Sequence, residues 1–382
     1  VFIPGLAGSV LKGTLNIPDS VSLPNHLCAR HTKSRELFWF NPARVVPFEI
    51  DCLLFYCQLV FNTTTRLLQR PNYADLDISD FGGLTDLEYL EPSGLVHEFS
   101  SYFHILIESF RNMGFVDGKN LFGAPFDWRF TPDANNWVNN TKDLIERAFW
   151  TNNATKVTLV SHSMGGPFTY YFLMQQAIEW RAKFIHNWVP IAPVWIGTPL
   201  AALAQLYGYF FGVPLTPKGP TADLYHTFPS EFYLLPNEKY FGSQPMVTTP
   251  TSSYTSAEVP QLIHDRMKVA WALEYGKTAK DLNGQYDLAF PEGIAAINCV
   301  VGRGQSTVAS LKYESDSEIG KKAPTEINGD GDGTVLLKSS TIACDKWAQE
   351  KWPVEILSLQ TTHIGAMKHQ DTVSLVHKSA CF

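Results

Sequence analysis

Apolar positions recur along the chain with two different periods, and their alternation predicts an α/β fold. Short apolar runs rich in β-branched residues predict buried strands at residues 1–4, 156–160, 184–191, 294–301 and 354–359. We expect the runs at 294–301 and 354–359 to be the last two strands of the chain. Apolar residues at helical spacing predict helices at 97–113, 134–150 and 167–181, and a helical tail from residue 364. Strands that alternate with helices indicate a parallel sheet covered by helices.

Two stretches depart from this alternation. Residues 26–60 hold three cysteines, Trp39 and an apolar run at 53–56, and residues 197–293 are rich in Pro, Thr, Ser and Tyr with few clear periods. Because strands typical of a core resume after both, we interpret them as insertions into one core. We assign the core to 1–25, 97–196 and 294–382, a lid insertion to 26–60, and a cap insertion to 61–96 and 197–293.

Composition narrows the class of protein. The chain has 382 residues, 45% hydrophobic and 18% charged, with a formal net charge of −7. No basic block is long enough to indicate nucleic-acid binding, so we expect no nucleic-acid partner. The sequence has no run of about 20 apolar residues, so we predict no transmembrane helix. The 25 Phe, 15 Tyr and 10 Trp fit a large core and also fit apolar surface kept for lipid.

Cysteines and glycosylation sequons indicate the secretory pathway. The six cysteines form no CxxC pair, which argues against a zinc site, and their even number permits disulfides. These cysteines are Cys28, Cys52, Cys57, Cys299, Cys344 and Cys381. Acceptor sequons lie at Asn62, Asn139 and Asn153. Chance could produce the sequons alone, but together with the cysteines they favour an oxidising compartment.

The string Ser161-His162-Ser163-Met164-Gly165 lies between a predicted strand and a predicted helix. A nucleophile elbow needs this placement, because its serine occupies a strained strand-to-helix turn and small residues two positions away avoid clashes. We therefore expect Ser163 to be the nucleophile of an α/β-hydrolase fold and the side chain of His162 to point away. The alternative is a serine that only caps a helix.

The acid and the base of a triad on this fold follow the serine in the order acid, then histidine. His363 lies four residues after the last predicted strand, and Asp330 and Asp332 lie between the last two strands. We expect His363 to be the base and prefer Asp332 as the acid that orients it. His369 and His377 are predicted to be ordinary surface histidines of the terminal helix.

Calcium is the rival interpretation of these aspartates. Asn328, Asp330, Asp332 and Gly333 match the first half of an EF-hand loop. The twelfth position, which should be a glutamate, is Ser339, so we expect no metal here.

The oxyanion hole of this fold uses the amide that follows the nucleophile, here Met164, and a second amide from a loop after an early strand. Residues 4–8 supply such a loop, and its glycines let the backbone approach a substrate closely. We assign the second amide to Leu6. The alternative is a plain turn after the first strand.

These motifs together resemble the lecithin:cholesterol acyltransferase and lysosomal phospholipase A2 family. The matching strings are Ile3-Pro4-Gly5-Leu6-Ala7-Gly8-Ser9, Ala124-Pro125-Phe126-Asp127-Trp128-Arg129, His162-Ser163-Met164-Gly165, Gly331-Asp332-Gly333-Thr334-Val335, and His363. They cover nearly the whole chain in the order of the family. The string at 124–129 is distinctive, and we interpret it as a scaffold motif.

The resemblance implies a role for further residues. It supports Asp332 as the acid, with Leu6 and Met164 as oxyanion donors. It implies that Cys28–Cys52 staples a small membrane-binding subdomain in which Leu53, Leu54 and Phe55 meet the lipid interface, and that Trp39 belongs to a lid. It implies a second disulfide, Cys299–Cys344. It leaves Cys57 and Cys381 to pair with each other or stay free.

The activity that the resemblance implies is that of a serine phospholipase A and O-acyltransferase without cofactor. It would pass a glycerophospholipid acyl chain through an acyl-serine to water or to a lipid alcohol. The partner would be a phospholipid membrane or lipoprotein surface, and the location secreted or in the lumen of the lysosome or vacuole. Leu6 replaces the acidic residue or cysteine of the family's two branches. The alternatives are a neutral-lipid or carboxyl esterase and a lipid-binding pseudoenzyme.

Overall fold

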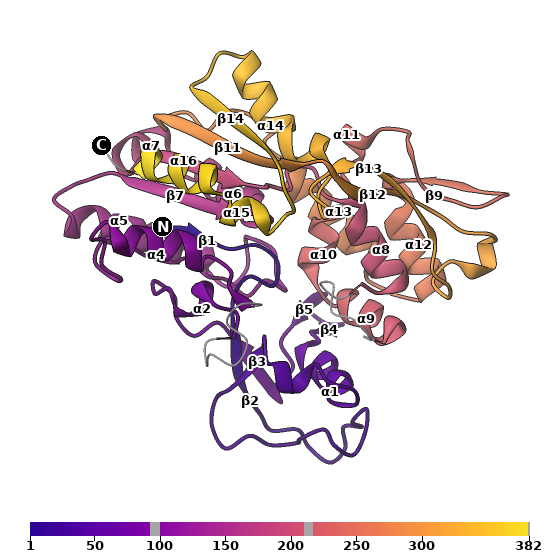
Figure 1. The fold of residues 1–382 in the computed structure, drawn as a ribbon. Coiled ribbons are helices and arrows are strands. Elements are labelled where there is room, and N and C mark those ends of the chain that lie inside the picture. The colour runs from indigo at the N-terminus through magenta and orange to yellow at the C-terminus, as the bar shows by residue number, and fades with distance from the viewer. Residues whose placement is uncertain (92–99, 210–216, 381–382) are drawn as a thin grey trace.

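A five-stranded parallel sheet forms the centre of the computed structural model, which describes residues 1–91, 100–209 and 217–380 (Figure 1). Its order is β1-β7-β8-β11-β14, and every neighbouring pair is parallel. These strands are β1 (Phe2–Ile3), β7 (Val157–His162), β8 (Ile185–Ile191), β11 (Ala296–Arg303) and β14 (Val354–Gln360). All five predicted strands are therefore present within about three residues of the expected bounds, and the predicted α/β class is confirmed.

Helices cover both faces of this sheet, as the alternation of side chains along each strand requires. Leu159 packs into the hydrophobic cluster that holds α5, α6 and α14, whereas its neighbour Val160 packs into the cluster that holds α4 and α16. The covering helices are α4 (His104–Asn112), α5 (Trp137–Thr151), α6 (Gly165–Met174), α7 (Ile178–Phe184), α14 (Leu337–Gln349), α15 (Gly365–Lys368) and α16 (Gln370–Ala380).

Two of the predicted helices differ from the observed ones. The single helix expected at 167–181 is two helices, α6 and α7, and the guanidinium of Arg181 donates to the carbonyls of Leu173 and Gln176 at the end of α6. Side-chain donors of this kind satisfy the free carbonyls at a helix end and favour a break there. The helix expected at 97–113 begins at His104, and residues 97–99 lie outside the described part of the chain.

A second, four-stranded sheet with the order β10-β9-β12-β13 lies in the lobe at the right of Figure 1. Its strands are β9 (Pro245–Thr248), β10 (Ser253–Thr255), β12 (Gln305–Lys312) and β13 (Thr325–Gly331). Beside it lie α8 (Pro199–Tyr207), α9 (Lys218–Tyr225), α10 (Pro229–Tyr233), α11 (Glu238–Phe241), η2 (Ser256–Glu258), α12 (Val259–Met267), α13 (Ala272–Gly284) and η3 (Asp316–Glu318).

The position of β12 and β13 corrects the prediction that residues 294–301 and 354–359 form the last two strands. Both new strands lie between β11 and β14 in the sequence, within the range assigned to the core. Residues of β13 are mostly exposed, so this strand carries no apolar run by which it could be recognised. The division into core, lid and cap insertions stays a prediction.

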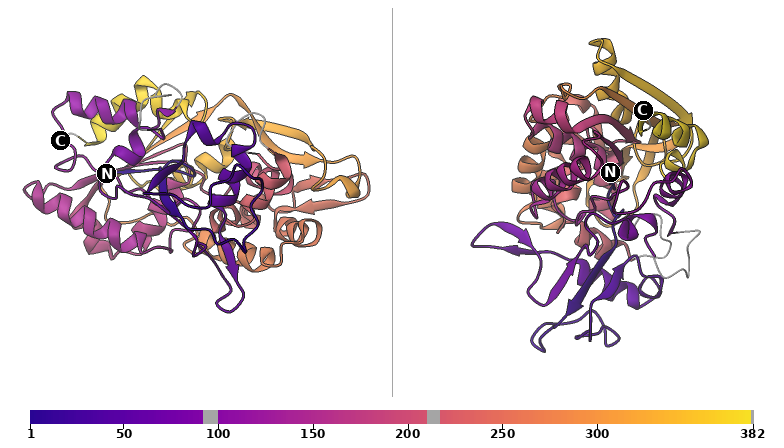
Figure 2. Two further views of the ribbon diagram at one scale, coloured as in Figure 1. Left: turned by 90° about the horizontal axis from the view of Figure 1, so that it is seen from below. Right: turned by 90° about the vertical axis from the view of Figure 1, so that its left-hand side faces the viewer.

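A small lobe projects from one end of the molecule in the views of Figures 1 and 2. It comprises a three-stranded sheet of order β3-β2-β6, a hairpin and α1. The elements of this region are β2 (Leu11–Leu15), β3 (Glu36–Trp39), η1 (Pro42–Arg44), α1 (Glu49–Cys57), β4 (Val60–Asn62), β5 (Leu67–Gln69), β6 (Ala74–Asp77) and α2 (Thr85–Glu88). The disulfide Cys28–Cys52 joins the loop after β2 to α1.

The Asp127–Arg129 pair ties the small lobe to the core. Arg129 is fully buried and donates to both carboxylate oxygens of Asp127, at 2.8 and 2.6 Å. It also donates to the carbonyls of Cys57 and Leu76 in the small lobe, at 3.2 and 2.7 Å, and Arg70 approaches the same carboxylate. Losing one partner of such a buried pair costs about 3–5 kcal/mol, because the other charge stays uncompensated. These contacts give the distinctive string at 124–129 a structural role.

Candidate active site

Ser163 occupies the sharp turn between β7 and α6. Its φ is 56°, a left-handed conformation that is costly for a residue with a side chain. The turn leaves no space around it: a Cβ on Gly165 would lie 2.2 Å from the carbonyl oxygen of Pro4, and one on Gly5 would lie 2.7 Å from Cβ of Ser163. Ser161, at the position where a glycine is usual, is buried and accepts a hydrogen bond from the indole of Trp188. The predicted nucleophile therefore has the geometry of an elbow.

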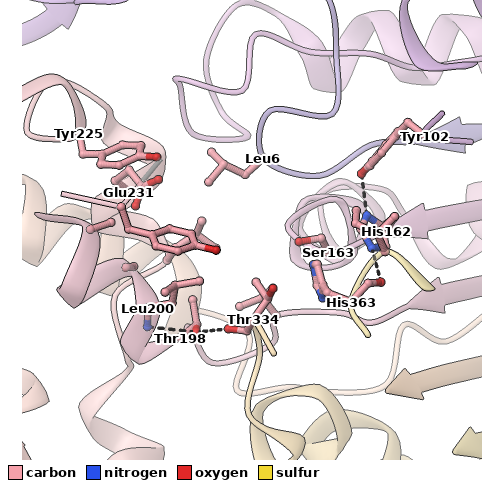
Figure 3. A pocket seen from close by; sticks show the side chains of 16 residues that line it. Leu6, Tyr102, His162, Ser163, Thr198, Leu200, Tyr225, Glu231, Thr334 and His363 are labelled. Atoms are coloured by element: carbon pink, nitrogen blue, oxygen red, sulfur yellow. Dashed lines mark hydrogen bonds between the residues drawn. The ribbon is translucent and has the colours of Figure 1, made fainter. Parts of the chain in front are cut away.

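His363 and Asp332 are paired beside this turn. Nδ1 of His363 lies 2.7 Å from Oδ2 of Asp332, and both side chains are buried. Oδ1 of Asp332 accepts the amides of Thr334 and Val335, at 3.0 and 2.8 Å. Because the carboxylate only accepts, Nδ1 of His363 carries the proton and Nε2 keeps its lone pair. Figure 3 shows His363 and Ser163 side by side on one wall of a cavity.

Asp330, the other aspartate weighed from the sequence, lies on β13 and accepts the amide of Gly304 at 2.7 Å. Asn328 is on the same strand, and an extended strand does not wrap an ion as an EF-hand loop does. The structure thus contradicts the calcium alternative. Asp332 directly follows β13 rather than a long loop after β11, because the β12–β13 hairpin intervenes.

His162 corrects another expectation. Its side chain was predicted to point away from the site, but its ring centroid lies 4.7 Å from that of His363. Nδ1 of His162 lies 2.6 Å from the hydroxyl of Tyr102, which accepts the amide of Gly5, and Nε2 lies 3.3 Å from the carbonyl oxygen of His363. The carbonyl of His363 can only accept, so a neutral His162 donates through Nε2 and its Nδ1 accepts from the hydroxyl of Tyr102. Burial, and next the nearby His363, hold the pKa of His162 well below its ordinary value.

Tyr102 was not predicted from the sequence, since nothing in the sequence around it distinguishes it from a core tyrosine. His369 and His377 lie at the end of α15 and in α16, and neither lines the cavity beside Ser163.

The backbone of residues 5–8 approaches Ser163 from the end of β1. The amide of Gly8 donates to the carbonyl of Gly5 and closes a turn that leaves Leu6 on the cavity wall. Met164 is the first residue before α6 and is fully buried. In the described part of the chain, the amides of Leu6 and Met164 donate no hydrogen bond. Two amides without a protein acceptor among the described residues therefore belong to the two segments that meet at Ser163.

The structure contradicts the predicted membrane contact of Leu53 and Leu54. Both are buried, because the apolar side of α1 packs inside the small lobe rather than facing solvent. Phe55 is half-buried and stacks on Tyr73. Trp39 is also buried. Its indole donates to the carbonyl of Ala7 at 2.7 Å, so it supports the loop beside Ser163 and is not a mobile surface group here.

A cavity with about 860 Å³ of empty space opens in front of Ser163 and is partly open to solvent (Figure 3). Its wall is mainly apolar, formed by Leu6, Val194, Leu200, Ala201, Ala204, Leu234 and Ile364. Tyrosines and polar groups complete it, namely Tyr102, His162, Ser163, Thr198, Tyr209, Tyr225, Glu231, Thr334 and His363. An apolar pocket with a few convergent polar groups is the usual form of a lipid or small-molecule site. Glu231 was not predicted from the sequence.

Among the described residues, Glu88, His104 and Glu108 are close enough to hold a metal ion. The guanidinium of Arg111, however, donates to Glu88 at 2.7 and 2.8 Å and also reaches Glu108, and it compensates their charge. The cluster is therefore an ion-pair network, and it lies outside the cavity of Ser163.

Disulfides join Cys28 to Cys52 and Cys299 to Cys344, as the resemblance implied, with Cα atoms 5.2 and 6.5 Å apart. Cys57 is buried and free, and Cys381 lies outside the described residues. Within the described residues, no helix has the length and apolar character needed to span a bilayer.

Comparisons with known proteins agree with the resemblance. A family model described as lecithin:cholesterol acyltransferase matches residues 34–289. The lysosomal phospholipase A and acyltransferase of Canis lupus familiaris is 30% identical over 99% of this chain and 90% of its own. The Homo sapiens protein of that name is 31% identical over 91% and 81%. The phosphatidylcholine-sterol acyltransferase of Gallus gallus is 28% identical over 94% and 84%.

The solved structure of the Tle4–Tli4 complex contains a chain with the same overall fold. Its TM-score is 0.57 at 11% identity, and the match covers 99% of this chain and 96% of that chain. With its elbow serine, paired histidine and aspartate, and family match over residues 34–289, the chain belongs to the lecithin:cholesterol acyltransferase family.

Proposed function

We propose that the protein is a phospholipase A and acyltransferase that acts through an acyl-serine. The observation that carries the proposal is the position of Ser163: it stands at an elbow beside the His363–Asp332 pair and opens onto a mainly apolar cavity. The relatives named for this activity support it over nearly the whole chain.

The reaction begins at the acyl ester of a glycerophospholipid. Nε2 of His363 takes the proton of Ser163 as its oxygen attacks the carbonyl carbon, and Asp332 holds the imidazole in that tautomer. The collapse of the tetrahedral intermediate breaks the ester bond, and His363 returns the proton to the departing lysophospholipid oxygen. Water or a lipid alcohol then attacks the acyl-serine, with His363 again as the base.

The free amides of Leu6 and Met164 are the proposed oxyanion hole. They belong to the two segments that meet at Ser163, and they would stabilise the negative charge that develops on the carbonyl oxygen; each such donor contributes about 3 kcal/mol in other enzymes. Leu6 also presents an apolar side chain to the cavity, where its family has an acidic residue or cysteine. We therefore assign no acid-tuned carboxylate to that position.

The proposed location is the secretory pathway, the lumen of a lysosome or vacuole, or the outside of the cell, because two disulfides are expected in oxidising compartments. Asn139 and Asn153 are exposed, and Nδ2 of Asn139 donates to Oδ1 of Asn136 at 2.6 Å. Nδ2 of Asn62, on β4, donates to the side-chain oxygen Oε1 of Gln69 at 3.3 Å, so glycosylation there would give up that hydrogen bond.

Product analysis tests the function. Vesicles of phosphatidylcholine with a labelled acyl chain, with and without a lipid alcohol, should yield labelled free fatty acid and, with the alcohol, a labelled ester. A protein that cleaves only soluble short esters would be a carboxyl esterase, and one that turns over neither would be a pseudoenzyme. Either result contradicts the proposal.

The small lobe is the proposed site of contact with the lipid surface. Apart from Leu67 on the hairpin, its exposed large apolar residues are Leu27, Val46 and Phe48, with 49, 45 and 66% of their surface exposed, and we propose that these three take this role in place of the buried Leu53 and Leu54. Asn25 donates to the carbonyl of Phe48, which connects the loop of Leu27 to the start of α1.

The replacement Phe48→Glu is expected to weaken binding to phosphatidylcholine vesicles about tenfold, because it removes an apolar side chain from the interface and adds a charge. Co-flotation with vesicles measures this, and cleavage of a soluble short ester should be unchanged. Leu67→Glu is the matched control, since Leu67 is 58% exposed on the β4–β5 hairpin. Equal loss in both variants would contradict a specific role for the tip around Phe48.

A further inference from the structure

Glu231 places a carboxyl group in the wall of the cavity that holds Ser163. It lies on α10, has 2% of its surface exposed, and appears beside the hydroxyl of Tyr225 in Figure 3. Its backbone is fixed on both sides, because its amide donates to the carbonyl of Phe228 and its carbonyl accepts from the side chain of Gln205. The side chain is therefore held at this position.

The carboxyl group of Glu231 has no hydrogen bond or ion pair with any described residue. No lysine or arginine is among the described residues that line the cavity, and burial raises the pKa of Glu231 to about 8. At neutral pH the group is therefore mostly protonated, with one O–H to donate and a carbonyl oxygen to accept. A buried polar group without a partner destabilises a protein, and such groups commonly mark a function.

We propose that Glu231 is a specificity-determining residue whose carboxyl group hydrogen-bonds an oxygen atom of the bound lipid, away from the ester at Ser163. The inference rests on the proposed function. The cavity wall is mainly apolar, so a hydrocarbon chain fills the space but offers the carboxyl no hydrogen-bond partner. A lipid with a hydroxyl or carbonyl at this point pairs with it, and a polar site of this kind disfavours the analogue that lacks the oxygen.

The oxygen can come from two sources, a substituent on the acyl chain or a second hydroxyl on the acceptor alcohol. Two competition experiments distinguish them. In the first, vesicles contain equal amounts of phosphatidylcholine with a hydroxylated and with a plain acyl chain, and water is the acceptor. In the second, the acyl donor is plain, and a monoacylglycerol competes with a long-chain mono-alcohol.

Three proteins are compared at pH 7: the wild type, Glu231→Gln and Glu231→Leu. The wild type should prefer the oxygenated lipid in one of the two experiments, and Glu231→Leu should lower that preference about tenfold, the loss of one paired hydrogen bond. Glu231→Gln keeps the shape and the hydrogen-bonding capacity, so it should retain most of the preference. The same preference in all three proteins, in both experiments, overturns the proposal.

Raising the pH from 7 to 9 in both the wild type and Glu231→Gln distinguishes the ionisation of Glu231 from that of the other titratable groups that line the cavity. These groups are Tyr102, His162, Tyr209, Tyr225 and His363. Ionisation of Glu231 removes its donor, so the preference of the wild type should fall while that of Glu231→Gln stays constant. An equal fall in both proteins contradicts the role of the Glu231 proton.

Failure of the proposed function would be seen separately, as loss of all turnover. The subsite can then be tested without catalysis in the Ser163→Ala variant, with and without Glu231→Leu. The measurement is the shift in melting temperature on binding a hydroxylated or a plain long-chain alcohol. Glu231→Leu should itself melt at a higher temperature, because it replaces an unpaired carboxyl with an apolar group of similar size. A preference lost together with a raised melting temperature excludes misfolding as the cause.

Discussion

The replacement Ser163→Ala should lower the rate of phospholipid cleavage by about 10⁶-fold, down to the level set by binding alone. The hydroxyl is the proposed attacking group, and the left-handed turn directs it towards His363 and the cavity. Alanine fits the same turn, so the fold should be retained. Release of labelled fatty acid from phosphatidylcholine vesicles measures the effect, and both hydrolysis and acyl transfer should be lost together.

Labelling with a fluorophosphonate probe provides an independent measurement. The wild type should be labelled at one serine, and the label should be absent in Ser163→Ala. Ser374→Ala, at an exposed serine of α16, is the matched control and should behave as the wild type. Lipid turnover retained in Ser163→Ala would mean that the nucleophile has been assigned to the wrong residue.

The replacement Asp332→Asn should lower the rate by about 10⁴-fold, the effect known for the acid of such triads. The amides of Thr334 and Val335 both donate to Oδ1 of Asp332, so the oxygen of asparagine would stay with them. Its amino group would then face His363 and donate to Nδ1. The imidazole would be forced to carry its proton on Nε2, where it cannot accept the proton of Ser163.

Asp330→Asn is the matched control, because Asp330 lies on β13 two residues before Asp332. Within the described ranges, its carboxylate accepts a hydrogen bond only from the amide of Gly304, and an asparagine oxygen can accept the same bond, so activity should change less than threefold. Comparable losses in the two variants would contradict the assignment of Asp332 as the acid. The activity of each variant, measured as a function of pH between 5 and 9, reports whether the histidine remains the base.

The sheet and the serine could be predicted because their signals are local. Buried strands such as β7 and β8 are short segments rich in apolar residues, and the elbow around Ser163 needs small neighbours that are visible in five residues. The order of Ser163, Asp332 and His363 adds a constraint along the chain. The roles of these three residues remain proposals that the variants above test.

The remaining features depend on which side of an element faces the core. The resemblance implies a lipid contact for the apolar run of α1, yet Leu53 and Leu54 are buried, because the sequence cannot distinguish a buried apolar run from an exposed one. His162 lies beside His363 because of contacts with Tyr102, which is 60 residues distant in the sequence. Glu231 gives no local signal, since its unusual environment is made by elements from several parts of the chain.

The hydrogen-bonded series from Gly5 through Tyr102 and His162 to His363 draws on segments from the beginning to the end of the printed sequence. Synthesis by the ribosome therefore delivers the elbow serine well before its base. A nascent chain that already carries Ser163 lacks the histidine that is proposed to activate it until β14 and the residues up to His363 have been translated and docked. The topology thus keeps the serine without its base while the segment between them, about 200 residues long, is made.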